Sequence, residues 1–232
     1  MPRTARIVVP DIPHHITQRG NNRQDVFFVD DDRWSYLELL NNYAHKFALE
    51  ILGYCLMTNH VHIIAVPKNE DSLAKAVGRT NLIHAQYINR LHNRSGHLWQ
   101  NRFFSCPLGP RHFFKALCYI ERNPVRSKMT RFAWQYQWSS AAAHTGKNDP
   151  AGIIDPALWR QISSGINYKD MLTHAEDKEE LRKIRTCLNI GRPLAGDSFL
   201  SKLEHTLGRR LRPLPVGRPK NSKKPLKTHL KR

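Results

Sequence analysis

Acidic residues are scarce in this sequence. Its 232 residues include 37 Lys and Arg but only 19 Asp and Glu, which gives a formal net charge of +18 and a pI near 10.2. This imbalance favours a polyanionic partner, and nucleic acid is the most common one. An anionic membrane surface is the alternative, but long apolar runs are also absent. The sequence therefore predicts no signal peptide, no transmembrane helix and no membrane partner.

Paired cysteines and phosphate-binding loops are absent as well. The four cysteines form no Cys-x-x-Cys motif, which argues against a cysteine-based zinc site and a disulfide framework. Free thiols are typical of a reducing cytoplasm, and together with the positive charge they predict a cytoplasmic, nucleoid-associated protein. No Gly-x-x-x-x-Gly-Lys motif occurs, so we expect no nucleotide cofactor.

Residues 53–67 predict two short apolar strands joined by a polar turn at Thr58 and Asn59. The second strand carries His60 and His62, and because side chains alternate along a strand, both imidazoles project from one face. Two such imidazoles can hold one divalent cation. Histidines also occur in cores with their hydrogen bonds satisfied, so the spacing alone leaves both interpretations open.

The order of the predicted elements indicates the fold. Apolar periodicity and turn residues predict strand, helix, strand, strand, helix and strand over residues 12–19, 30–47, 53–57, 60–67, 72–91 and 96–105. This order is the ferredoxin-like β-α-β-β-α-β pattern, an α+β fold with an antiparallel sheet. The inner face of the second helix is predicted to consist of Leu73, Ala76, Val77, Thr80, Ile83, Tyr87 and Leu91.

A third helix is predicted after Pro110, ending before Pro124, and it carries Tyr119. A loop rich in Gly, Asn, Asp and Pro near residues 146–156 marks a boundary. We therefore expect a main domain over residues 1–146 and a small helical extension over residues 157–208. Residues 209–232 contain ten basic residues, four prolines and no acidic residue, which is typical of a disordered basic tail.

Tyr119 and Asn123 stand four residues apart, a spacing that places both side chains on one helix face. A packed tyrosine and an asparagine before a proline would explain this pair without any chemistry. With His60 and His62 beside them, two nitrogens and one amide oxygen would leave open positions on a metal for phosphate oxygens.

Three motifs, in this order, resemble the single-tyrosine HUH transposases, and more narrowly the REP-associated tyrosine transposases. They are Leu56-Met-Thr-Asn-His-Val-His-Ile-Ile, Leu98-Trp-Gln-Asn-Arg-Phe and Tyr119-Ile-Glu-Arg-Asn-Pro-Val-Arg. The resemblance covers residues 10–145 and includes Gln18-Arg-Gly-Asn-Asn-Arg and Gln137-Trp-Ser-Ser. Segments at residues 189–194 and 207–211 resemble the carboxy-terminal extension of that family.

The resemblance implies that His60, His62 and Asn123 hold Mg²⁺ or Mn²⁺ and that Tyr119 is the nucleophile. The implied reaction cleaves and rejoins single-stranded, hairpin-forming DNA through a 5′-phosphotyrosine intermediate. Because a free phenol has a pKa near 10, Tyr119 needs help to lose its proton, and the sequence does not identify the helper. Nor does it distinguish a monomer from a dimer in which Tyr119 meets the partner's histidines.

The expected DNA-binding residues are basic or polar and lie near these motifs or in the tail. They are Arg19, Asn21, Arg23, Arg79, Arg102, Arg122, Arg126, Arg209, Arg210, Arg218 and Lys220. Trp99, Phe103 and Phe104 are candidates for stacking on unpaired bases or for core packing.

Two other functions are compatible with the sequence. The first is a domesticated, non-enzymatic protein that binds DNA or RNA hairpins on the same scaffold. The intact set of His60, His62, Tyr119 and Asn123 favours the enzyme, because a binding protein would not need it. The second is a replication initiator or relaxase with the same chemistry, which the absence of a helicase segment disfavours.

Overall fold

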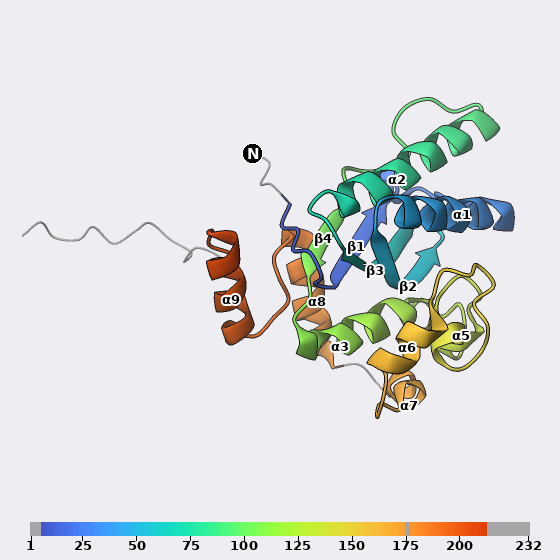
Figure 1. The fold of residues 1–232 in the computed structure, drawn as a ribbon. Helices are drawn as coiled ribbons and strands as arrows, with labels where there is room; N and C mark the ends of the chain where they lie inside the picture. The colour runs from blue at the N-terminus through green and yellow to red at the C-terminus, as the bar shows by residue number, and fades with distance from the viewer. Residues whose placement is uncertain (1–5, 175–176, 213–232) are drawn as a thin grey trace, which may run out of the picture.

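A four-stranded antiparallel sheet is the centre of the protein, as the computed structural model of residues 6–174 and 177–212 shows (Figure 1). The strands are β1 (His14–Arg19), β2 (Leu49–Met57), β3 (His60–Pro67) and β4 (Phe104–Pro107), in the spatial order β2-β3-β1-β4. Helix α1 (Asp30–Lys46) follows β1 and helix α2 (Ser72–Leu91) follows β3. The predicted β-α-β-β-α-β fold is confirmed.

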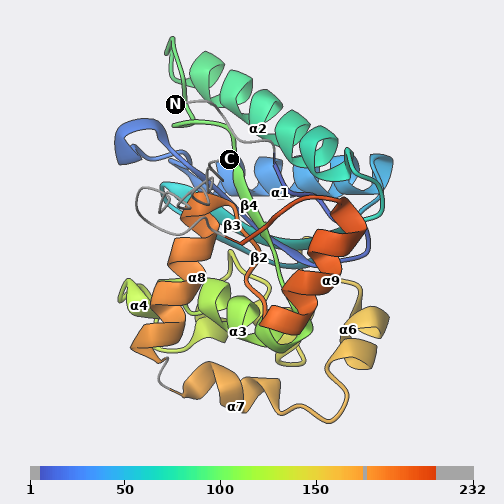
Figure 2. The same ribbon diagram turned by 90° about the vertical axis from the view of Figure 1, so that its left-hand side faces the viewer.

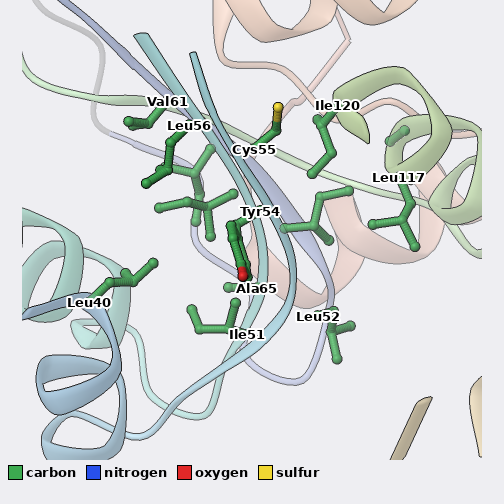
Figure 3. Packing of buried hydrophobic residues seen from close by; sticks show 14 of the residues in the cluster. Leu40, Ile51, Leu52, Tyr54, Cys55, Leu56, Val61, Ala65, Leu117 and Ile120 are labelled. Atoms are coloured by element: carbon green, nitrogen blue, oxygen red, sulfur yellow. The ribbon is translucent and has the colours of Figure 1, made fainter. Parts of the chain in front are cut away.

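Helices cover both faces of this sheet. Helices α1 and α2 pack on each other and on β2 at one face. Helix α3 (Pro110–Glu121) packs on β2 and β3 at the other face, and α8 (Lys178–Ile190) lies against β4 and β1 (Figures 1 and 2). Figure 3 shows Leu40 of α1 on one side of the sheet and Leu117 and Ile120 of α3 on the opposite side.

Helix α1 begins where its sequence predicts. The carboxylate of Asp32 accepts hydrogen bonds from the backbone N–H groups of Phe28 (2.6 Å) and Val29 (3.1 Å), which stabilises the helix start. Tyr36, Leu37 and Leu40 recur at helical spacing and are buried against the sheet.

The predicted inner face of α2 is correct in the first half of the helix and wrong in the second. Leu73, Ala76, Val77 and Thr80 are buried, but the buried face continues through His84 and Ile88, and Leu91 is 53% exposed. His84 takes the inner position because its Nε2 hydrogen-bonds to the Val26 carbonyl (2.9 Å) and its ring contacts the Tyr36 ring. A polar side chain with such a partner can be buried at small cost.

The strand predicted over residues 96–105 is also misplaced, since β4 covers only Phe104–Pro107. Gly96 has a φ of +91°, a left-handed conformation that ends extended structure. The next residues cross the end of β1, where Gln100 N–H donates to the Arg19 carbonyl (2.9 Å). Leu98 and Phe103 are buried, so the apolar content of this segment serves packing rather than a strand.

The remaining helices are short, apart from the last. They are the 3₁₀ helices η1 (Asn21–Arg23) and η2 (Ala133–Gln135) and the α-helices α4 (Asn123–Arg126), α5 (Ala141–His144), α6 (Pro156–Ile162), α7 (Tyr168–Thr173) and α9 (Asp197–Leu207). Helix α9 contacts the first described residues, where Leu203 and Leu211 form a small cluster with Ile7 and Val9. None of the helices in residues 6–174 and 177–212 is long and apolar enough to span a membrane.

The extension packs on the main domain. Trp159, Leu172, Ile184 and Leu188 belong to the same hydrophobic cluster as the sheet. The boundary near residues 146–156 stays a prediction, and these contacts show that the helices after it share the core of the helices before it. The expected tail begins at residue 209, and its residues 213–232 lie outside the described residues.

A buried carboxylate joins the two parts. Glu121 follows Tyr119 on α3 by two residues and accepts hydrogen bonds from Ser140 Oγ (2.5 Å), His144 Nδ1 (2.7 Å) and Tyr168 Oη (2.8 Å). Because Glu121 is fully buried, these contacts compensate for the loss of water around its charge. They hold the end of the tyrosine-bearing helix against α5 and α7.

Gly53 allows α3 to approach β2 closely. A Cβ atom at this position would lie 2.4 Å from Leu117 Cδ1. We expect Gly53→Ala to lower the free energy of unfolding by about 1–3 kcal/mol, because the fully buried Leu117 side chain must shift within a packed core to make room. Urea denaturation of Gly53→Ala and of Gly78→Ala checks this, since a Cβ at Gly78 on α2 meets nothing within 4 Å. Equal stability of the two variants would contradict this role of Gly53.

Candidate active site

The register of β1 against β3 assembles one face of the site. Thr17 lies opposite His62 and Arg19 lies opposite His60, so these side chains project from the same face of the sheet. Both positions on β1 border the pocket that contains the two histidines. Arg19 is exposed and lowers the pKa of His60, which burial alone already depresses.

Both histidines are held in fixed orientations by their Nδ1 atoms. His60 Nδ1 hydrogen-bonds to the side-chain oxygen of Asn59 (2.6 Å), and His62 Nδ1 hydrogen-bonds to His15 Nε2 (2.9 Å). These contacts leave the Nε2 atom of each ring for a ligand. Burial lowers the pKa of His60 to about 4 and that of His62 well below its usual value, so both rings are neutral near pH 7 and can donate a lone pair.

His15 is a site residue that the sequence reasoning missed. It is fully buried on β1, and its ring centroid lies 5.1 Å from that of His62 and 5.8 Å from that of Tyr119. Burial lowers its pKa to about 3, so the neutral ring takes part in a single hydrogen bond that fixes the tautomer of His62. His15 and Thr17 are two residues apart on a predicted strand, so the sequence places their side chains on the same face of the sheet. Only the register of β1 against β3 shows that His15 reaches His62.

Tyr119 lies next to the histidines of its own chain. Its ring centroid is 5.8 Å from that of His62, and the residue is 7% exposed. The Arg126 guanidinium lies 4.4 Å from the centre of the tyrosine ring, and its Nη2 donates to the Tyr119 carbonyl (2.6 Å). The structure therefore places a fixed positive charge beside the phenol.

Asn123 lies at the same site, on α4 rather than on the helix of Tyr119. Arg122 separates the two helices. Asn123 Oδ1 accepts a hydrogen bond from Arg126 Nη2 (2.5 Å), and its buried Nδ2 has no hydrogen-bond partner among the described residues. As an N–H donor, Nδ2 can bind an acceptor such as a phosphate oxygen, whereas only Oδ1 could bind a cation.

The donor set fits a divalent cation held by two imidazoles and an amide oxygen. Among residues 6–174 and 177–212, no three His, Cys, Asp or Glu side chains converge in a way that could hold a metal ion. Asn123 would therefore have to supply the third protein ligand. Its Oδ1 atom would have to give up the hydrogen bond from Arg126 in order to bind the metal. The amide oxygen suits Mg²⁺ and Mn²⁺, whereas imidazole nitrogens also suit softer divalent metals, so the donor set indicates a divalent cation without selecting the element. Three protein ligands leave positions open for phosphate.

The extension contributes to the site. Tyr119, His60, His62 and Asn123 line one pocket of about 490 Å³, and Arg185, Leu188 and Asn189 of α8 form another part of its wall. The sequence placed these α8 residues outside the catalytic domain. Their contribution depends on the packing of α8 against β1 and β4, which no local pattern predicts.

The expected DNA-binding residues lie in several different places. Arg19, Arg102 and Arg126 lie at the site, and Asn21 and Arg23 lie on η1, directly after β1. Arg209 and Arg210 line a neighbouring groove. Arg79 is exposed on α2, which covers the opposite face of the sheet, and Arg122 donates to the carbonyls of Leu172 and His174. Arg218 and Lys220 lie outside the described residues.

Buried neutral histidines make the stability of the fold depend on pH. Burial lowers the pKa values of His14 and His84 to about 4, from the ordinary value of 6.5 that applies in the unfolded chain. Between these values the unfolded chain binds protons that the folded protein does not, so stability falls as pH decreases from 6.5 towards 4. We expect these two residues to contribute a slope of up to about 3 kcal/mol per pH unit.

Urea denaturation in EDTA at pH values from 7 to 4.5 checks this prediction. In His84→Gln, whose amide can still donate to the Val26 carbonyl, the slope should fall by about 1.4 kcal/mol per pH unit. Equal slopes in the two proteins would contradict this contribution of His84.

A family model identifies the class of protein. Residues 8–123, half of the chain, match the family model described as "Transposase IS200 like", and the chain belongs to this family. Its fold is similar to that of the solved REP-associated tyrosine transposase bound to a REP hairpin. That match has a TM-score of 0.55 and 14% sequence identity over 67% of this chain and 90% of that one.

A putative transposase from Deinococcus radiodurans is also similar, with 19% identity over 52% of this chain and 97% of that chain and a TM-score of 0.37. No curated protein matches the chain. Membership of a transposase family gives the protein DNA binding and DNA cleavage in general terms.

Proposed function

We propose that the protein is a metal-dependent, single-tyrosine transposase that cleaves and rejoins single-stranded DNA carrying REP-like hairpins. The observation that carries this proposal is the convergence of Tyr119, His60, His62 and Asn123 on one pocket within one chain. The hairpin part rests on the structurally similar transposase, which was solved with a REP hairpin.

His60 Nε2, His62 Nε2 and Asn123 Oδ1 would hold Mg²⁺ or Mn²⁺. When bound, the cation polarises the scissile phosphodiester and orients it for attack. The hydrogen bonds that His60 and His62 donate through Nδ1 to Asn59 Oδ1 and His15 Nε2 keep both imidazole planes fixed, so the chain needs little rearrangement to present the Nε2 atoms.

Tyr119 supplies the nucleophile. Its oxygen loses the phenolic proton and forms a bond to phosphorus while the bond from phosphorus to the 3′ oxygen breaks. The 3′ oxygen takes up one proton and leaves as a hydroxyl, so one proton is lost and one is gained in the step. One phosphodiester is replaced by one phosphotyrosine diester, so the step is reversible and needs no nucleotide hydrolysis. Arg126 over the tyrosine ring and Arg19 beside His60 stabilise the negative charge of the phosphate and of the attacking oxygen.

The surface for the hairpin is proposed on the same side of the protein as the site. Arg19, Asn21 and Arg23 surround the end of β1, and Asn22 and Arg23 adopt φ values of +50° and +60°. This turn exposes both Arg19 and Arg23 next to the pocket. Arg79 and Arg122 are left out of the proposed surface, because Arg79 lies on the opposite face and Arg122 holds α7.

The test is incubation of the protein with labelled hairpin DNA that carries single-stranded flanks on both sides. We expect cleavage and a covalent protein–DNA product on a denaturing gel in Mg²⁺ or Mn²⁺, and neither product in EDTA. Specific binding of hairpins without cleavage in any divalent metal would instead support the non-enzymatic, domesticated protein.

A single chain should suffice for the reaction, because Tyr119 contacts the histidine of its own chain. We expect an equimolar mixture of Tyr119→Phe and His62→Ala to remain inactive, with less than about 1% of wild-type cleavage. In a dimer with exchanged tyrosines, about half of the subunits in the mixture would pair into hybrids with one intact site. Recovery of tens of per cent of the activity would therefore contradict an active site built from one chain.

A further inference from the structure

A basic groove adjoins the active-site pocket. It has a volume of about 650 Å³ and is lined by Arg6, Arg102, Arg192, Arg209, Arg210 and Phe104. Arg102, Phe104 and Asn189 border both the groove and the pocket of Tyr119, so the two spaces are adjacent at these residues. Figure 2 shows the elements that form its surroundings, with β4 between α8 and α9.

The arginines of the groove are fixed in place by other parts of the chain. Arg6 lies 3.6 Å from the centre of the Phe103 ring and donates to the Phe103 carbonyl (2.9 Å). Arg209 donates to the Arg6 carbonyl (3.4 Å), and Arg192 donates to the carbonyl of Leu211. Segments from both ends of the described chain and from the middle of it therefore build one cationic surface.

The described lining of the groove and the pocket is basic, and the nearest acidic side chain beside Arg209 and Arg210, that of Glu204, lies outside this lining. The described residues that line the groove and the pocket include no Asp or Glu. Burial lowers the pKa of Arg6 to about 10, and the positive charge of the neighbouring Arg102 makes a smaller contribution in the same direction. A bound polyanion would remove this repulsion and would release counterions.

Phe104 gives the groove a second property. Its side chain is 44% exposed at the junction of the two spaces, although it begins a strand whose next three residues are buried. An exposed aromatic ring beside cationic side chains is the arrangement that binds unpaired nucleotides, with the base on the ring and the phosphates on the charges. The bases of a duplex are already stacked on each other and cannot use it.

We propose that the groove of Arg6, Arg102, Phe104, Arg192, Arg209 and Arg210 holds the single-stranded DNA that continues from the cleavage site. This inference rests on the proposed function, because that function supplies the single strand. It assigns a role to Arg6 and Arg192, selects Phe104 as the stacking residue, and separates the path of the unpaired strand from the hairpin surface around Arg19 and Arg23.

Binding of three probes to the full chain tests the proposal by fluorescence anisotropy in EDTA: a bare hairpin, the hairpin with single-stranded flanks, and the hairpin with the same flanks made double-stranded. We expect Phe104→Ala to weaken binding of the single-stranded flanked probe about tenfold and that of the bare hairpin less than twofold. Arg209→Ala should lower the slope of log K against log salt by about 0.7 for the flanked probe only.

Two control variants match these changes. Trp34→Ala removes an aromatic side chain that is 43% exposed on α1, and Arg160→Ala removes an exposed arginine on α6. Both should bind all three probes like the wild type. Circular dichroism of each variant verifies that it is folded.

Three results would contradict the proposal that the groove binds single-stranded DNA. They are an unchanged affinity of Phe104→Ala for the single-stranded flanked probe, an equal loss for the bare hairpin, and an equal loss for the double-stranded flanks. Because the assay measures binding without metal, it does not depend on cleavage. A protein that forms no covalent adduct would refute the proposed reaction without affecting the proposal for the groove. Normal adduct formation together with unchanged binding by Phe104→Ala would refute the proposal for the groove and not the reaction.

Discussion

Tyr119→Phe will abolish the covalent protein–DNA adduct and reduce cleavage by at least about 10³-fold. The change removes only the oxygen that attacks phosphorus, and the ring contacts with His15, His62 and Arg126 remain possible. Binding of the flanked hairpin should therefore stay within about twofold of the wild type. Denaturing gels for the adduct and anisotropy for binding measure the two quantities separately.

Tyr43→Phe is the matched control for this variant. Tyr43 lies on α1 and stacks on Phe47, at the face of the sheet opposite to the site. It should form adduct at the wild-type rate. An adduct of normal yield in Tyr119→Phe would mean that another residue is the nucleophile.

His62→Ala will eliminate binding of Mn²⁺ at the site and lower cleavage by about 10³-fold, since a cation that stabilises the phosphate contributes several kcal/mol to catalysis. The loss of metal can be measured without DNA, by titration of the protein with Mn²⁺ and detection of the free ion by electron paramagnetic resonance. His45→Ala on α1, where the histidine is exposed, should bind Mn²⁺ like the wild type.

His15→Ala provides a graded comparison with His62→Ala. It removes the partner of His62 Nδ1 but leaves all proposed ligands, so Mn²⁺ affinity should fall about 10–100-fold rather than disappear. Unchanged Mn²⁺ affinity in His62→Ala would contradict the metal site. Unchanged Mn²⁺ affinity in His15→Ala would mean that His15 contributes to core packing and not to the metal site.

The sequence predicts the fold well because the elements that carry it have strong local signals. The turn at Thr58 and Asn59, the helix starting at Asp30 and the apolar run of β3 depend on neighbouring residues only. The errors occur where tertiary contacts decide. Ile83 was predicted on the inner face of α2, but His84 occupies that position. The hydrogen bond of His84 to the Val26 carbonyl depends on a loop that is distant in sequence.

The candidate site was predictable only in part for the same reason. His60, His62, Tyr119 and Asn123 belong to short motifs and could be named from them. His15 could not, because its contact with His62 follows from the register of β1 on β3. The part of the pocket wall formed by α8 could not be predicted either. This helix begins about 60 residues after Tyr119 and reaches the pocket only because it packs on the edge of the sheet.

The basic residues show a further limit of sequence reasoning. Arg122 and Arg126 belong to the same motif and looked equivalent, but Arg122 holds α7 whereas Arg126 lies over Tyr119. Arg6 stands outside every motif and is brought to the groove by its contacts with Phe103. Charge alone therefore identifies the type of partner, and the packing of each guanidinium determines where that partner binds.

The central claim is that Tyr119 becomes joined to the 5′ phosphate of the cleaved DNA strand. It is tested most directly by mass spectrometry of the proteolysed adduct formed with flanked hairpin DNA in Mn²⁺. The account predicts one modified peptide, with the 5′ phosphate of the cleaved strand on Tyr119. A modification on any other residue, or strand cleavage without a protein–DNA bond, would contradict it.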